Sequence, residues 1–314
     1  MITVERLSKA YGSKKAINEL TFTVPDATVT GFLGPNGSGK STSMRCILGL
    51  DKPNSGRALF DGTPFADIAD KSAVAGSLLD AAWFTPERSG RGHLRALAAG
   101  AGLPGDRVDE CLELVGLTEA AGKRVKGYSL GMKQRLGIAA ALLGNPRHLI
   151  LDEPVNGLDP EGVSWMRTTI RRLADDGCAV LVSSHLLSEM QQTADRLVVI
   201  GKGEMIGEYG MDEFLSGGAS IVVASENNAA IAQKLNSMGV EVTGNAELLR
   251  AGVPAETDES ELRRVIAHTC LRENIAVTHL STETQNLEQR FLAATAASQE
   301  YRSAHTTRVH EGAL

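Results

Sequence analysis

Several features are scarce or absent in this sequence, and each absence excludes a class of protein. No apolar run approaches the roughly 18 residues of a membrane-spanning helix, so we expect any membrane step to depend on another chain. The net charge of −6 gives no positive field that would indicate a nucleic-acid partner. The four cysteines lie far apart and form no C-x-x-C pair, a pattern typical of reduced core thiols in a cytosolic protein. Residues 1–6 begin a strand pattern without the features of a signal peptide.

The most informative stretch is residues 34–42, which fit the phosphate-binding pattern G-x-x-x-x-G-K-[ST] at every defined position. Residues 29–33 predict a buried strand before it, and residues 42–48 predict a helix after it, which is the context that the pattern requires. Glycines allow the backbone N–H groups to turn toward phosphate oxygens, while Lys40 supplies a cation and Ser41 a hydroxyl ligand for Mg²⁺. The predicted binding residues are Gly34, Pro35, Asn36, Gly37, Ser38, Gly39, Lys40, Ser41 and Thr42.

Two carboxylates follow the apolar strand predicted at residues 149–151. A strand of this type lies beside the phosphate loop, so Asp152 is expected to hold Mg²⁺ through water. Glu153 is then expected to orient or deprotonate the attacking water. Tyr11 precedes the phosphate loop and has two interpretations, an aromatic ring stacked on a purine or a tyrosine on a surface turn.

Hydrophobic periodicity divides the chain into three parts, residues 1–218, 219–297 and 298–314. The first part combines antiparallel strands, buried parallel strands and a helical insert at about residues 85–144. A linker at residues 216–218 leads to a small α+β domain of the split-βαβ kind, with its last helix expected at residues 284–294. Residues 298–314 are polar and aperiodic and predict a frayed tail.

Three further motifs complete the pattern. Residues 128–132 read Tyr-Ser-Leu-Gly-Met at the start of a predicted helix, residues 156–159 read Asn-Gly-Leu-Asp, and Ser184 is followed by His185. With the phosphate loop and the strand that ends in Asp152 and Glu153, five motifs occur in one order over about residues 1–215. This order resembles the nucleotide-binding subunit of an ABC transporter.

The resemblance implies an α/β fold of the P-loop NTPase type, with an antiparallel β subdomain and a helical insert. It implies that the site binds ATP and Mg²⁺, with Ser41, Asp152 and Asp80 near the metal. Glu153 would be the catalytic glutamate and His185 the switch histidine at the γ-phosphate. Outside the phosphate loop, Tyr11 would contact the adenine of ATP. Further nucleotide contacts would come from Ser129, Gly131, Met132 and Asp159. Of these, Ser129, Gly131 and Met132 belong to the signature motif, which would act in trans on ATP held by a second, identical subunit.

Two motifs depart from the family pattern. The signature reads Tyr-Ser-Leu-Gly-Met where the family has Leu-Ser-Gly-Gly-Gln, and Asp80 stands where the family has the Q-loop glutamine. Trp83 and Phe84 follow Asp80, either as a docking surface for the membrane partner or as core residues beneath the insert.

The C-terminal part is similar to that of ATP-binding subunits of bacterial ABC-2-type drug and antibiotic exporters. The resemblance therefore implies an ATPase at the cytoplasmic face of the cell membrane that powers export through separate permease subunits, without a nucleic-acid partner. A soluble non-transport ABC ATPase and a regulatory ATP-binding module are the alternatives. The cargo is not encoded in this chain.

Overall fold

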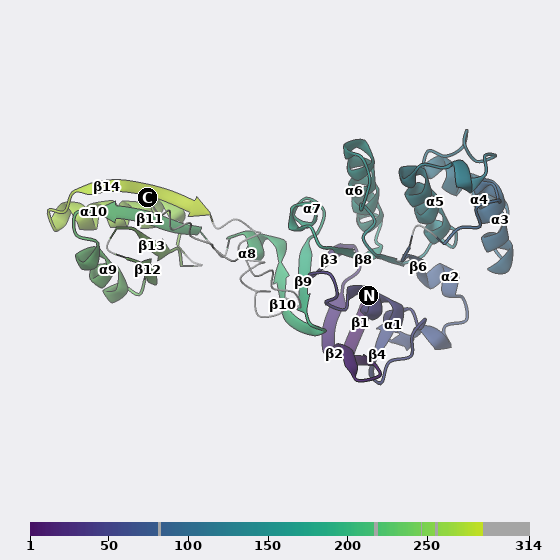
Figure 1. Cartoon of the computed structure of the whole chain (residues 1–314), viewed down its shortest axis with the longest axis horizontal. Helices are drawn as coiled ribbons and strands as arrows, with labels where there is room; N and C mark the ends of the chain where they lie inside the picture. Colours follow the sequence, from purple (N-terminus) through teal and green to yellow (C-terminus); the bar gives the residue numbers. More distant parts are fainter. Residues whose placement is uncertain (81–82, 217–218, 246, 255–256, 285–314) are drawn as a thin grey trace, which may run out of the picture. The chain divides into compact units, whose positions relative to one another are not determined.

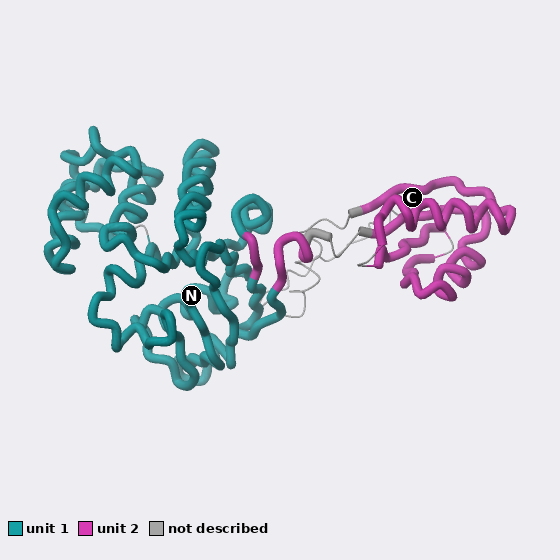
Figure 2. Tube along the Cα trace, turned by 180° about the vertical axis from the view of Figure 1, so that it is seen from behind, with its two compact units in different colours: residues 1–194, 198–208, 295–314 teal, residues 195–197, 209–294 magenta. Residues whose placement is uncertain are grey.

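The chain divides into two compact units in the computed structural model, which describes residues 1–80, 83–216, 219–245, 247–254 and 257–284 (Figures 1 and 2). Of the described residues, the first unit contains those within 1–194 and 198–208, and the second contains those within 195–197 and 209–284. The domain boundary expected after residue 218 stays a prediction. Residues 285–294 of the expected last helix and the expected tail lie outside the described residues.

An antiparallel sheet in the first unit has the strand order β2-β1-β4-β5. Its strands are β1 (Ile2–Tyr11), β2 (Lys14–Val24), β4 (Ser55–Phe60) and β5 (Thr63–Pro64). The register between β1 and β2 shifts near Leu7 and again near Lys9. Such bulges break the period of two on which the sequence pattern depends. Tyr11 is therefore the last residue of β1 rather than part of a turn.

A second sheet, whose strands belong mainly to the first unit, has the order β10-β9-β3-β8-β7-β6. Its strands are β3 (Thr28–Leu33), β6 (Ala75–Leu78), β7 (His148–Leu151), β8 (Ala179–Ser184), β9 (Arg196–Gly201) and β10 (Glu204–Gly210). Strands β3, β8, β7 and β6 run parallel, and every residue of β7 and β8 is buried. Strand β8 separates β3 from β7, so the strand before the phosphate loop and the strand that ends at Asp152 are not hydrogen-bonded neighbours. Buried parallel strands all read as short apolar runs, and such runs carry no information on strand order.

Helices of the first unit follow the strands and fill the insert between β6 and β7 (Figure 1). They are α1 (Lys40–Ile47), α2 (Lys71–Val74), α3 (Gly90–Gly100), α4 (Asp106–Leu114), α5 (Leu130–Leu142), α6 (Pro160–Asp175) and α7 (Leu187–Gln191), with short 3₁₀ turns η1 (Phe65–Asp67) and η2 (Val125–Gly127). Side-chain oxygens of Ser89, Ser129 and Asp159 cap α3, α5 and α6 by accepting backbone N–H bonds. Within the described ranges, no helix combines the length and the apolar character needed to cross a bilayer.

The two sheets of the first unit share one hydrophobic core with α1. Phe22 and Phe60 from the antiparallel sheet, Phe32 and Ile150 from the larger sheet, and Met44 from α1 all belong to it. Helix α1 follows directly from the loop after β3, so burying Met44 against both sheets also fixes the start of that helix. The core therefore fixes the position of α1, and with it the end of the phosphate loop.

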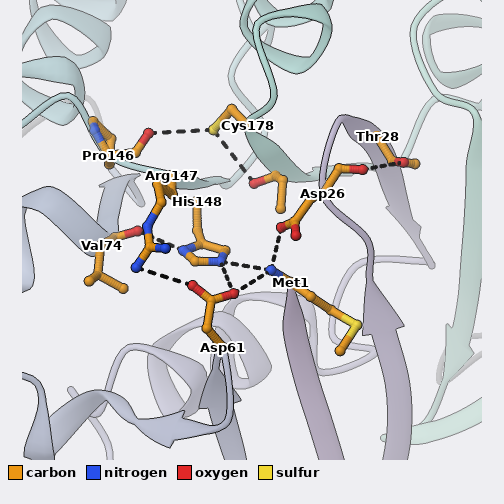
Figure 3. A network of polar contacts seen from close by, with 10 residues as sticks. Met1, Asp26, Thr28, Asp61, Val74, Pro146, Arg147, His148 and Cys178 are labelled. Carbon is orange, nitrogen blue, oxygen red and sulfur yellow. Dashed lines mark hydrogen bonds and ion pairs between the residues drawn. The ribbon is translucent and has the colours of Figure 1, made fainter.

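A polar network also joins the two sheets, and Figure 3 shows it from close by. The N-terminal ammonium of Met1 donates to Asp26, to Asp61 at 2.7 Å and to His148 Nε2 at 3.0 Å. His148 Nδ1 lies 2.7 Å from the carbonyl oxygen of Val74 and must carry the hydrogen, because that oxygen can only accept. His148 is fully buried at the start of β7, and this arrangement satisfies both of its ring nitrogens. The network thus connects the beginnings of β1 and β7.

The second unit is a small α+β domain. Its elements are α8 (Met211–Ser216), β11 (Ala219–Ser225), α9 (Asn228–Ser237), β12 (Val242–Gly244), β13 (Leu249–Gly252), α10 (Glu259–Arg272) and β14 (Val277–Thr284). The sheet is antiparallel with the order β12-β13-β11-β14, which is the split-βαβ arrangement that the sequence predicts. Ile221 and Val223 on β11 pack in one core with Leu235 of α9 and Ile266 of α10.

All four cysteines, Cys46, Cys111, Cys178 and Cys270, are buried free thiols. Burial raises the pKa of Cys46 to about 11 and that of Cys178 to about 12. Burial also raises the pKa of Cys111 and Cys270. At neutral pH these side chains are therefore protonated and act as small core residues.

Candidate functional site

The loop between β3 and α1 has a backbone that only glycine accepts at three positions. Gly37 and Gly39 have φ angles of 81° and 106°, in the left-handed region. A Cβ at Gly39 would lie 2.5 Å from the carbonyl oxygen of Ala16, and one at Gly34 would lie 2.5 Å from the carbonyl oxygen of Ile200. The hydroxyl oxygen of Ser38 is buried and has no hydrogen-bond partner among the described residues. The loop is thus a close-fitting cradle with an unused polar group.

Lys40, the first residue of α1, is buried, with 7% of its surface exposed. Its Nζ donates to the carbonyl oxygens of Gly34 at 2.6 Å and Pro35 at 3.4 Å. It also lies 3.6 Å from Glu153 Oε1. Burial lowers the pKa of Lys40, and the nearby carboxylates of Glu153 and Asp152 oppose that shift. The lysine is therefore a partly desolvated cation that connects the loop to the end of β7.

Asp152 and Glu153 follow β7 and are positioned by the two neighbouring strands. The backbone N–H of Asp152 donates to Leu78 at the end of β6, at 2.8 Å. Ser183 of β8 donates its hydroxyl to Asp152 Oδ1, and its oxygen accepts the backbone N–H of Glu153 at 2.9 Å. Ser183 carries this contact because β8 lies between β7 and β3, and no local motif marks it as a site residue.

Glu153 has an unusual backbone and a histidine partner. Its φ is +48°, a left-handed conformation that is uncommon for a residue other than glycine and that recurs at functional sites. His185 follows β8, and its Nδ1 lies 2.8 Å from Glu153 Oε2. Glu153 therefore has one carboxylate oxygen near Lys40 and the other bonded to His185. The side chain is held from two sides at the end of the sheet.

A cavity of about 320 Å³ opens where these elements meet. Its lining includes residues 36–42, Asp152 and Glu153, together with Tyr11, Lys14 and Ala16 from the antiparallel sheet. Gly34 and Pro35 contribute instead through their carbonyl oxygens on Lys40. Sequence reasoning missed Lys14 and Ala16, because they acquire a role only when the β1–β2 hairpin folds over the loop.

Tyr11 is 51% exposed at the edge of this cavity. Its hydroxyl donates to Asp51 Oδ2 at 2.8 Å, and Asp51 in turn accepts from Arg45 of α1 at 2.8 Å. The bond to Asp51 raises the pKa of Tyr11. The ring is thus held by the same helix that begins at Lys40, a connection that the sequence does not indicate.

The remaining predicted residues lie away from this cavity. Ser129, Gly131, Met132 and Asp159 are not among its lining residues, and they cluster at the starts of α5 and α6. Ser129 accepts the N–H of Met132 at 3.2 Å, and Asp159 accepts that of Gly162 at 2.8 Å. Asp80 is exposed after β6 and does not line the cavity either.

The two aromatic residues after Asp80 lie in different environments, one at the surface and one packed in the insert. Trp83 is 61% exposed, whereas the ring of Phe84 meets His93 of α3 edge-on at 5.0 Å. Burial lowers the pKa of His93, and the charge of Arg88 adds to that shift. Phe84 is thus a packing residue of the insert, and Trp83 is a surface residue.

A larger groove of about 640 Å³ lies in the second unit, on α9 and α10. It is lined by Lys234, Met238, Glu261, Arg264, Val265, His268, Thr269, Arg272 and Glu273. No glycine cradle or carboxylate pair of the kind described above converges there among the residues the structure describes. Volume alone is therefore a poor guide to the reactive site in this protein.

Comparison with known proteins gives one consistent result. The sequence profile of the family described as "ABC transporter" matches residues 17–156. The uncharacterized ABC transporter ATP-binding protein YdbJ of Bacillus subtilis is 36% identical over 308 residues, covering 96% of this chain and 97% of the relative. The bacitracin transport ATP-binding protein BcrA of Enterococcus faecalis is 33% identical over 294 residues, covering 93% and 95%. A solved ATP-binding subunit of an ABC transporter superposes with a TM-score of 0.62 at 26% identity, over 68% of this chain and 91% of that one. These likenesses confirm the predicted fold class.

Proposed function

The chain belongs to the family of ABC transporter ATP-binding proteins, and we propose that this ATPase drives the export of a drug or antibiotic through membrane subunits carried on other chains. One observation carries the catalytic part of the proposal. The glycine cradle, the buried Lys40 and the carboxylates of Asp152 and Glu153 surround a single cavity. A cation and two acids around a phosphate cradle are the groups that hydrolysis of a nucleoside triphosphate requires.

The loop and Lys40 bind the phosphates of ATP. The glycines of the loop and the start of α1 offer backbone N–H donors and a positive helix end to the phosphate oxygens. The buried hydroxyl of Ser38, which has no hydrogen-bond partner in the described part of the chain, is a further donor in the same cradle. Lys40 turns its ammonium from the carbonyl oxygens of Gly34 and Pro35 toward the β- and γ-phosphates, which compensate its charge better than neutral carbonyls.

The residues present also fit a magnesium ion. Ser41 and Asp152 line the same cavity and offer a hydroxyl and a carboxylate oxygen, the donor types that Mg²⁺ prefers. When bound there, the ion neutralises charge on the phosphate oxygens. Ser183 orients the Asp152 carboxylate through its hydroxyl. The assignment of Asp80 as a third metal residue stays a prediction, because its side chain is exposed outside the lining.

Glu153 is the proposed general base. It accepts a proton from the attacking water while the water oxygen bonds to the γ-phosphorus and the bond to the ADP oxygen breaks. His185 Nδ1 contacts one oxygen of its carboxylate, so the base is oriented before the reaction. Tyr11 stacks on the adenine, with its ring fixed by Asp51.

A second copy of the chain completes the site in this proposal. Ser129, Gly131 and Met132 lie at the N-terminus of α5, away from the chain's own cavity. A helix N-terminus with a serine hydroxyl is suited to the γ-phosphate of ATP held by another subunit. Two copies would bury two ATP molecules between them, with Asp159 at the same interface, and closing and reopening would move the permease subunits at the cytoplasmic face of the membrane.

Phosphate release and membrane association test the proposal together. The purified chain should release inorganic phosphate from ATP with Mg²⁺, while Glu153→Gln should bind ATP and release almost none. A tagged chain expressed in its own host should co-purify with a polytopic membrane protein, and deletion of that protein should abolish export. An active ATPase without such a partner would indicate a soluble ABC ATPase instead. A chain that binds ATP and never hydrolyses it, even with its membrane partner, would indicate a regulatory module.

A further inference from the structure

The segment from Glu153 to Asp159 consists of two overlapping turns. The N–H of Asn156 donates to the carbonyl oxygen of Glu153 at 3.2 Å, and that of Leu158 donates to Val155 at 3.1 Å. Asp159 then caps α6. Each turn is closed by one hydrogen bond, and the segment begins at a residue with a strained φ of +48°. Its path therefore needs support from outside if Glu153 is to stay in one position.

That support comes from the first residue of α5. A Cβ built on Gly157 would lie only 2.5 Å from Leu130 Cδ2, so the leucine side chain lies directly on the glycine. A second contact runs the other way, because Leu158 Cδ2 lies 3.6 Å from the Cβ position of Gly131. Gly157 has a φ of +75°, a left-handed conformation that favours glycine. The leucine fills the space that a side chain on Gly157 would need.

Leu130 is one of the positions at which this chain departs from the family pattern, and the family has a glycine there. A glycine there has no side chain to reach the turn segment. Leu130 is 46% exposed, so its burial contributes less to stability than that of a core leucine. Because Ser129 precedes Leu130 in the chain, the contact between Leu130 and Gly157 connects Ser129 to the segment that begins at Glu153.

We propose that Leu130 is a positioning residue for ATP hydrolysis, because its side chain holds residues 153–159 against the N-terminus of α5. It thereby sets the position of Glu153 relative to Ser129. This inference rests on the proposed function, since it assigns Glu153 to the reaction. A contact of this kind acts on the chemical step and leaves the phosphate cradle untouched, because Leu130 does not line the cavity.

Steady-state kinetics of two variants separate positioning from simple packing. Leu130→Ala should lower kcat about tenfold, because small displacements of a reacting group reduce rates by up to about a hundredfold. Its ATP affinity, measured by titration without turnover, should stay within about twofold of wild type, because cradle and lysine are unchanged. Leu130→Met restores a long apolar side chain and should recover most of kcat. Leu97→Ala removes a leucine of similar exposure, 42%, from α3 and should leave kcat unchanged.

A double-mutant cycle tests the contact itself. Gly157→Ala places a methyl group 2.5 Å from Leu130 Cδ2 and should lower kcat sharply. In the Leu130→Ala background that clash is gone and only the cost of the positive φ remains, so the same substitution should cost less. Additive effects would overturn the proposal, and so would a Leu130→Ala enzyme with wild-type kcat. If the wild-type chain itself released no phosphate, the proposed function would fail instead, so the two failures are distinguishable.

Discussion

Replacement of Lys40 by methionine removes the ammonium and keeps most of the aliphatic chain. A hydrogen bond to a charged group contributes about 1.5–3 kcal/mol. Because about 1.4 kcal/mol is a factor of ten in affinity, losing one such bond to a phosphate weakens ATP binding about 10- to 150-fold. This estimate is a lower bound, because Glu153, now 3.6 Å from the lysine Nζ, would face the phosphates without its cation.

Stability should respond less than affinity to the same change. Lys40 donates to two carbonyl oxygens, but its burial carries a desolvation cost that also lowers its pKa. These terms oppose each other, so we expect the free energy of unfolding to fall by no more than about 2 kcal/mol. ATP titration and urea unfolding of the same samples measure both quantities, with Lys52→Met, an exposed lysine outside the cavity, as the control. An affinity within about threefold of wild type would remove Lys40 from the phosphate site.

Three further changes address other groups. Glu153→Gln should pair on ATP in gel filtration and lose at least about a hundredfold in kcat, the usual share of a general base; near-normal phosphate release would mean that another group activates water. Tyr11→Ala should weaken ATP binding about 5- to 150-fold, since stacking contributes about 1–3 kcal/mol per base. Tyr11→Phe keeps the ring and should lose less of the ATP affinity. Equal affinities in the wild type and both variants would exclude stacking. Burial lowers the pKa of His93, so the contribution of the neutral side chain to the free energy of unfolding is complete above the unfolded-state pKa of 6.5 and is lost as pH falls through the folded-state pKa. His93→Gln should therefore reduce the loss of stability at acid pH, measured by urea unfolding at a series of pH values. An unchanged pH dependence would contradict this.

The sequence predicts the parts of this protein that local rules determine. The phosphate loop is recognisable because glycines, lysine and the flanking strand and helix are neighbours in the chain. Asp152, Glu153 and His185 are found at strand ends, as their positions after apolar runs indicate. Strand order is not local, so the insertion of β8 between β3 and β7, and with it the role of Ser183, was not predictable.

Contacts between distant segments are the other part that the sequence leaves undetermined. The hydrogen bond between Tyr11 and Asp51 and the contact of Leu130 with Gly157 depend on how turns and helix starts pack. No sequence motif assigns such a contact to Asp51 or to Leu130. The split-βαβ domain is recognisable from its alternating elements, but the residues at which its helices and strands begin and end are not. Element ends depend on caps and pairing, and periodicity does not report them.

The protonated, inaccessible state of the four thiols has a practical consequence for measuring subunit motion. Maleimide dyes react with thiolates at the surface, so the native chain should remain unlabelled while it is folded. A single cysteine introduced on an exposed position of α5 would then carry the only dye on each copy. Energy transfer between two labelled copies would follow their approach and separation during turnover, and none of the four natural cysteines would have to be replaced first.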